Sequence, residues 1–148
     1  MKHLENRRLW RGILAAMSIP LALIAFWPSP VDGPVQGELA SILSFLHTHG
    51  IPRWFNYKFV EAAANVALFI PLGVVASLAF AEKRWWKIGA FGLIVSGCME
   101  LGQLLFLHNR FASLQDIVTN TGGAVIGALL AIAALKKLQA RRPSAAGL

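Results

Sequence analysis

The sequence predicts an all-α membrane protein: a bundle of four transmembrane helices with a short amphipathic helix on the outer surface. The first observation is composition, because 56% of the 148 residues are hydrophobic and only 14% are charged. A soluble domain carries about 25% charged residues and, at this length, could not bury so much apolar surface in an aqueous core. The other two observations are that the apolar residues gather in four long runs and that the basic residues lie between and beyond them.

The four apolar runs are the predicted transmembrane helices, at about residues 12–27, 60–81, 88–107 and 117–135. A spanning helix needs about 20 mostly apolar residues, with a range of about 17–25. The first run is the shortest, and Trp10 and Trp27 flank it, as aromatic residues do at membrane interfaces. No small-x-small cleavage site follows that run, which disfavours a signal peptide. Residues 1–11 and 136–148 are then a cytoplasmic N-terminal segment and a basic cytoplasmic tail.

The distribution of basic residues predicts the orientation. If all four runs span, three Lys and Arg residues lie on one side, namely Arg53, Lys58 and Arg110. Eleven lie on the other side: Lys2, Arg7, Arg8, Arg11, Lys83, Arg84, Lys87, Lys136, Lys137, Arg141 and Arg142. The positive-inside rule places the richer side, and therefore both termini, in the cytoplasm. Because the net charge of +7 is stored beside apolar runs, nucleic-acid binding is not expected.

The segment between the first two runs contains the predicted amphipathic helix, at residues 38–49. Its apolar residues Leu39, Ile42, Leu43 and Leu46 follow the i, i+3, i+4, i+7 pattern of one helix face. Gly50 and Pro52 would end the helix, and aromatic residues suited to the headgroup zone follow them. Two locations fit this pattern: the outer membrane surface, or a hydrophobic cap over the bundle.

Polar residues inside the apolar runs are the candidate functional residues. An acidic side chain at the centre of a spanning helix costs about 2.5–3.5 kcal/mol on insertion scales, so each one needs a reason. In the four-span topology they all lie in the outer half of the bilayer, with Arg110 in the short outer loop as the nearest cation. They predict a pocket open to the outside or a buried polar network closing the bundle there. The residues are Glu61, Asn65, Glu100, Gln103, Asp116 and Asn120.

Other sequence features predict packing rather than chemistry. Gly123 and Gly127 form a G-x-x-x-G pattern that lets a neighbouring helix approach closely. His47 and His49 are two residues apart and point in different directions on a helix, so no metal site is expected. No phosphate-binding or dinucleotide-binding loop is present in the sequence, and no cofactor is expected.

Two segments resemble the signatures of VanZ-like membrane proteins. Asn65, Phe69, Pro71 and Gly73 match an N-x-x-x-F-x-P-x-G signature. The second signature is matched by Glu100, Gln103, Arg110, Asp116, Asn120, Gly123 and Gly127. Many members carry a second acid beside the Asp, where this chain has Gln115. The resemblance implies a bacterial inner-membrane protein of four or five spans, related to low-level resistance to the glycopeptide teicoplanin and to envelope polysaccharide work.

Binding of a polar headgroup at the outer leaflet is the leading functional hypothesis, with a lipid-linked glycan or a cell-wall precursor as the ligand. The candidate binding residues are Glu61, Asn65, Gln103, Arg110 and Asn120. Glu100 and Asp116 would orient Arg110 or, in an enzyme, act as acid and base. Two further classes stay open: a membrane enzyme that uses these two carboxylates, and a small proton-coupled transporter that uses Glu61 and Glu100.

Overall fold

A computed structural model describes residues 6–27, 36–81, 84–107 and 113–141 of the chain. These residues form helices and no strand, which confirms the all-α prediction. The helices are α2 (Arg7–Ala25), α3 (Gln36–Thr48), α4 (Tyr57–Phe80), α5 (Trp85–Phe106) and α6 (Leu114–Ala140). Four of them, α2, α4, α5 and α6, are long and apolar enough to cross a membrane, as predicted. The fifth, α3, is the predicted short helix.

Each spanning helix begins before its predicted apolar run, and α6 also ends after its run, because hydropathy does not detect capping and helix propensity. Helix α2 begins at Arg7 because the Asn6 side chain accepts a hydrogen bond from the backbone N–H of Leu9, at 3.2 Å. Helix α4 begins after Asn56, which caps it in the same way. Helix α6 continues past residue 135 to Ala140 because Lys and Gln are good helix formers and cations are favourable at a helix C-terminus.

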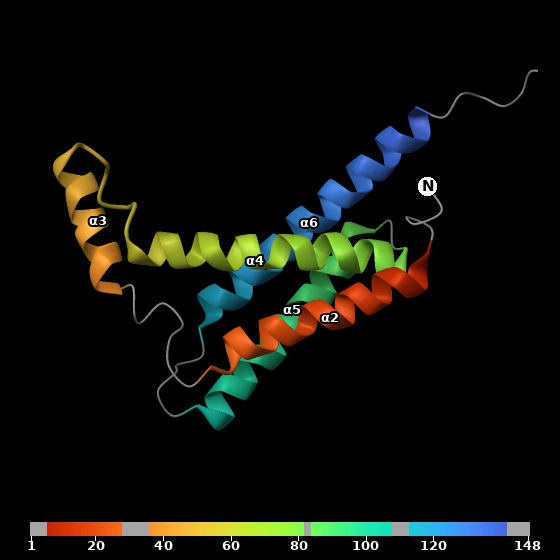
Figure 1. Cartoon of the computed structure of the whole chain (residues 1–148), viewed down its shortest axis with the longest axis horizontal. Coiled ribbons are helices and arrows are strands. Elements are labelled where there is room, and N and C mark those ends of the chain that lie inside the picture. The colour runs from red at the N-terminus through yellow and green to blue at the C-terminus, as the bar shows by residue number, and fades with distance from the viewer. Residues whose placement is uncertain (1–5, 28–35, 82–83, 108–112, 142–148) are drawn as a thin grey trace, which may run out of the picture.

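The spanning helices are arranged around α4 and α6. The most extensive contact is between α4 and α6, followed by α5 with α6 and by α2 with α4. The N-terminus of α2 and the C-terminus of α6 lie at the same end of the bundle, which we call the termini end (Figure 1). Helix α3 and the N-terminus of α4 lie at the opposite end, which we call the α3 end. Helices α4 and α5 diverge toward the α3 end (Figure 1).

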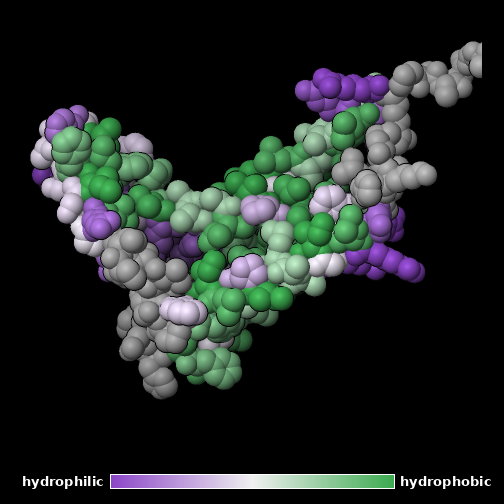
Figure 2. All heavy atoms as spheres, in the orientation of Figure 1, coloured by the Kyte–Doolittle hydropathy of each residue, from purple (hydrophilic) through white to green (hydrophobic). Residues whose placement is uncertain are grey.

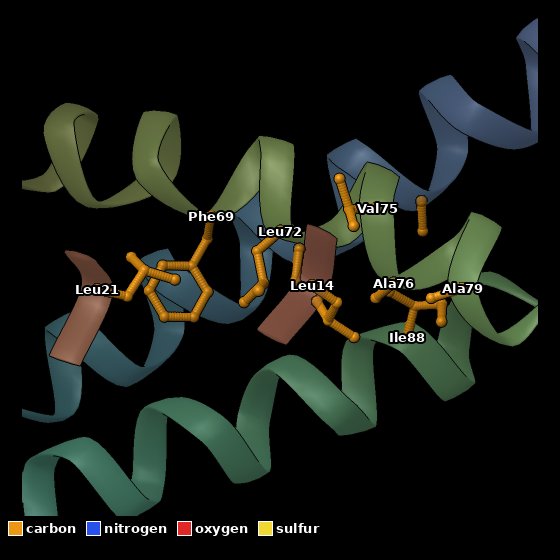
Figure 3. Packing of buried hydrophobic residues seen from close by; sticks show 10 residues of the cluster. Leu14, Leu21, Phe69, Leu72, Val75, Ala76, Ala79 and Ile88 are labelled. Atoms are coloured by element: carbon orange, nitrogen blue, oxygen red, sulfur yellow. The ribbon is translucent and has the colours of Figure 1, made fainter. Parts of the chain in front are cut away.

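The apolar core is contributed by all four spanning helices. Figure 3 shows Leu21 of α2 beside Phe69 of α4, and Ile88 of α5 beside Ala76 and Ala79 of α4. The alanines are fully buried, which allows the helix axes to lie close together. The buried cluster is Leu14, Leu21, Phe69, Leu72, Val75, Ala76, Ala79, Ile88, Ala124 and Ala128.

Glycines bring the backbones of α4 and α6 into direct contact. A Cβ atom added at Gly123 would collide with the carbonyl oxygen of Val66, and one at Gly127 would collide with that of Ile70. From the opposite side, a Cβ at Gly73 would lie 2.8 Å from the carbonyl carbon of Ala124. The G-x-x-x-G pattern therefore does lie at a helix contact, as the sequence predicted, and α4 is its partner.

Helix α3 lies crosswise beside the N-terminal end of α4 rather than over the core (Figure 1). Leu43 is its buried residue, whereas Ile42 and Phe45 are exposed. The His47 imidazole Nε2 lies 2.9 Å from the carbonyl oxygen of Phe55, which ties α3 to the segment before α4. Among the described residues α3 packs mainly against α4, which favours the outer membrane surface over a cap on the bundle.

Candidate functional site

The candidate residues come from the halves of α4, α5 and α6 that lie toward the α3 end. In α4 one helix face carries Asn65, Phe69, Leu72, Ala76 and Ala79 at spacings of three and four residues. Phe69, Leu72, Ala76 and Ala79 belong to the buried apolar core. Asn65 is therefore the polar residue that follows the core on this face, toward the α3 end. The described polar residues of α5 and α6 lie on faces that carry buried residues as well.

Asp116 and Asn65 join α6 to α4. The Asn65 Nδ2 amide donates a hydrogen bond to Asp116 Oδ1, at 3.0 Å. Asp116 lies in the first turn of α6, where the partial positive charge of the helix N-terminus favours a carboxylate. Both side chains are half-buried. Asp116 is therefore a carboxylate held in place by the fold and still accessible.

Glu100 joins α5 to the beginning of α6. Its carboxylate oxygen Oε2 accepts a hydrogen bond from the backbone N–H of Ser113, at 2.6 Å, and its side chain is 5% exposed. Ser113 is the N-cap of α6, and its hydroxyl accepts from the backbone N–H of Asp116 at 3.3 Å. Ser113 thus bonds to both acidic residues, which brings the two candidate carboxylates to the same helix terminus.

Gln103 joins α5 to the end of α2. Its Nε2 amide donates to the backbone carbonyl of Ala25 at 2.9 Å, and Ala25 is the last residue of α2. Carbonyls in the last turn of a helix lack an intrahelical donor, so Gln103 satisfies a backbone acceptor inside the bundle. The neighbouring Gly102 contacts the Phe26 ring, since an added Cβ would lie 2.6 Å from Phe26 Cε1. The observed hydrogen bond of Gln103 therefore stabilises the end of α2.

Asn120 lies deepest, between α6 and α5. Its Nδ2 donates to the hydroxyl of Ser96 at 2.9 Å, and the two side chains are 5% and 0% exposed. The other polar atom of the amide, Oδ1, is buried and has no hydrogen-bond partner among the described residues. An unsatisfied buried acceptor costs about 1–3 kcal/mol. Asn120 therefore keeps one hydrogen-bond acceptor to which no described residue donates.

Two candidates are positioned differently. Glu61 is exposed on α4, one helical turn before Asn65. Arg110 lies outside the described residues, so its predicted pairing with an anion stays a prediction. Figure 2 shows hydrophilic atoms beneath the N-terminal half of α4. The described polar residues thus adjoin the apolar core on the side toward the α3 end.

Two residues that hydrogen-bond to the candidate residues, Ser96 and Ser113, are not among the functional residues that the sequence predicts. Ser113 was detectable, because Ser113-x-x-Asp116 is the spacing of a helix-capping box. The partner of Gln103 was not detectable, because it is a backbone carbonyl 78 positions away in the sequence. Within the described ranges no group of three or more His, Cys, Asp or Glu side chains is placed to hold a metal ion.

Comparison with known proteins agrees with the resemblance. The model of the VanZ/LLP1 family matches residues 14–136, which include all of α4 and α5 and most of α2 and α6. The chain is similar to Protein VanZ of Enterococcus faecium, with 27% identity over 122 residues that cover 80% of this chain and 71% of that protein. No solved structure matches it. The family match covers far more than half of the sequence, and the chain belongs to the VanZ/LLP1 family.

Proposed function

We propose that this protein binds a polar headgroup, that of a lipid-linked glycan or a cell-wall precursor, at the outer leaflet of the bacterial inner membrane. The observation that carries the proposal is the half-buried Asp116 carboxylate, which Asn65 holds at 3.0 Å at the edge of the apolar core. A carboxylate and an amide at the rim of an apolar core are suited to hydrogen-bonding the hydroxyl groups of a sugar.

The proposed orientation puts the α3 end outside the cell. The described basic residues at the beginnings of α2 and α5 and the end of α6 would then face the cytoplasm. Arg110 belongs to the segment that joins α5 to α6 and would pair with an anionic group of the ligand. Glu100 would position the start of α6, and with it Asp116, through the backbone of Ser113.

An acid–base enzyme is the second candidate, because both acidic residues lie at the start of α6. The Glu100 carboxylate accepts from the Ser113 backbone N–H, and the Asp116 backbone N–H donates to the Ser113 hydroxyl. In such an enzyme one carboxyl group would donate a proton and the other would accept one. The proton-coupled transporter is less well supported. Among the described buried residues on the termini side of the site, Ser77 is polar and none is charged, so they provide no described proton relay across the membrane.

Exchange of Asp116 for asparagine tests the proposal. Asp116→Asn keeps the side-chain shape and an oxygen that can accept from Asn65, but it removes the charge. We expect at least a tenfold loss of activity with unchanged membrane expression and melting temperature. Activity is measured as teicoplanin susceptibility and envelope polysaccharide output in a strain that lacks the protein.

Glu38→Gln is the matched control, since it makes the same chemical change at an exposed position of α3. It should leave activity at the wild-type level. If Asp116→Asn lost activity only in proportion to lost expression, Asp116 would be a scaffold residue and the proposed binding site would be wrong.

A further inference from the structure

The side of the α4–α6 contact that faces away from the core carries an apolar groove of about 380 Å³. None of its lining residues belongs to the polar site proposed above. Six of them come from one face of α4 and one comes from α6. They are Phe59, Ala62, Ala63, Val66, Ala67, Ile70 and Thr119.

The groove exists because α4 is recessed there. The lining of the groove includes three small side chains, those of Ala62, Ala63 and Ala67. The exposed surfaces of the other spanning helices carry mostly the larger side chains of Leu, Ile, Phe and Trp. The floor is closed by the contact between α4 and α6, since a Cβ at Gly123 would lie 2.9 Å from Phe69 Cβ and 3.1 Å from the carbonyl carbon of Val66. The groove is therefore a surface depression along the outside of the bundle and does not lead into its interior.

The lining of the groove is suited only to hydrocarbon. Thr119 is its one polar side chain, and its hydroxyl donates to the backbone carbonyls of Gln115 and Asp116 at 3.0 and 3.2 Å. Because that hydroxyl is engaged within α6, the groove presents alkyl and aromatic surface. A polar ligand would lose hydration there without gaining hydrogen bonds from side chains.

The length of the groove matches one leaflet of a bilayer. From Phe59 to Ile70, α4 rises about 16 Å at 1.5 Å per residue. The hydrocarbon core of a bilayer is about 30 Å thick, so half of it is about 15 Å. Phe59 lies near the α3 end of α4, and Ile70 lies just past the midpoint of the helix. A lipid chain from the leaflet at that end is the occupant that this depth and length allow.

The groove lies level with the polar pair, on the other side of the α4–α6 contact. Ala62 lies one helical turn before Asn65 in α4, and Thr119 lies one turn after Asp116 in α6. A lipid whose hydrocarbon chain lies in the groove would therefore have its headgroup at the α3 end of α4 and α6, the two helices that carry Asn65 and Asp116.

We propose that the groove binds one hydrocarbon chain of a lipid whose headgroup occupies the Asn65–Asp116 site. This inference rests on the proposed function and narrows its ligand to a molecule anchored in the membrane. A water-soluble sugar or peptide of the same headgroup chemistry would engage the polar site without the groove and would bind more weakly.

The test blocks the groove and compares two probes on the full chain in lipid nanodiscs. One probe is a sugar linked through diphosphate to a polyisoprenyl chain, and the other is the same sugar diphosphate without the chain. Ala63→Trp fills the groove. Ala64→Trp is the matched control, because Ala64 is the next residue, is also exposed and does not line the groove. Binding is measured by native mass spectrometry and by the shift in melting temperature.

We expect Ala63→Trp to weaken binding of the chain-linked probe at least tenfold and to leave binding of the sugar diphosphate unchanged. Ala64→Trp should bind both probes as the wild type does. Three results would contradict lipid-chain binding in the groove without contradicting the polar site. They are unchanged affinity of Ala63→Trp for the chain-linked probe, an equal loss of affinity in Ala64→Trp, and equal affinity of the wild type for the two probes. If the wild type bound neither probe, the proposed function would fall, and this inference with it.

Discussion

A buried amide in a membrane bundle stabilises the fold when it satisfies a backbone group that has no other donor. Gln103 does this for the last residue of α2. The amide is 7% exposed, so neither the side chain nor the carbonyl of Ala25 has ready access to water. Asn120 is different, because only one of the two polar atoms of its amide has a partner among the described residues. Among the deep polar residues, Gln103 therefore belongs to the scaffold, and Asn120 retains capacity for a ligand.

Replacement of Gln103 by methionine should separate stability from function. Methionine keeps the length of the side chain and removes the donor, which leaves the Ala25 carbonyl unsatisfied. We expect the free energy of unfolding to fall by about 1–3 kcal/mol, with activity per folded molecule unchanged. Thermal unfolding in nanodiscs measures this, and Leu104→Met, at an exposed neighbouring position, is the control. Loss of activity in protein of normal stability would instead return Gln103 to the ligand site.

At the residue scale, the sequence identified which polar side chains lie together but not what they bond to. The cost of polar groups in lipid, together with helical spacing, is enough to place Asn65, Glu100 and Asp116 in one region. The partners of Glu100 and Gln103 are backbone groups of Ser113 and Ala25, and their positions depend on where α6 begins and α2 ends. Those ends are set by caps, which hydropathy does not detect.

At the scale of elements, the contact between α4 and α6 determines the architecture. It places Asn65 against Asp116 on the core side and creates the apolar groove on the other side. Glycines on both helices make the contact close enough for backbone to meet backbone, with Gly73 in α4 and Gly123 and Gly127 in α6. The sequence indicated the α6 pair by its spacing. It did not identify α4 as the partner, because helix pairing depends on long-range packing.

Two adjacent glycines of α6 provide a controlled test of this contact. A methyl group at Gly123 would collide with the carbonyl oxygen of Val66, whereas one at Gly122 would meet nothing within 4 Å. We expect Gly123→Ala to lower stability by about 1–3 kcal/mol through overpacking, and Gly122→Ala to change it little. Melting temperatures of the two variants, measured side by side, decide this. Equal stability would mean that α4 and α6 are not in backbone contact.

For the whole molecule, one bundle changes from an apolar core toward the termini end to a polar region toward the α3 end. This change along the bundle follows from the sequence, since the buried residues of one half are mostly Leu, Ala and Ile, and those of the other half include Glu100, Gln103 and Asn120. A polar site at one end of an apolar core is suited to binding a ligand from that end. The side of the membrane that this end faces depends on how the chain inserts.

Topology reporters test this orientation. The basic residues at the beginnings of α2 and α5 and at the end of α6 lie toward one end of the bundle, and their excess should hold this end in the cytoplasm. Fusions after Arg8, Arg84 and Arg141 should therefore read cytoplasmic, and fusions at Gly50 and Asn109 should read external. An external reading at Arg84 alone would contradict the crossing of the membrane by α4. Inversion of all five readings would keep the four spans but move the Asp116 site, and the groove beside it, to the cytoplasmic leaflet.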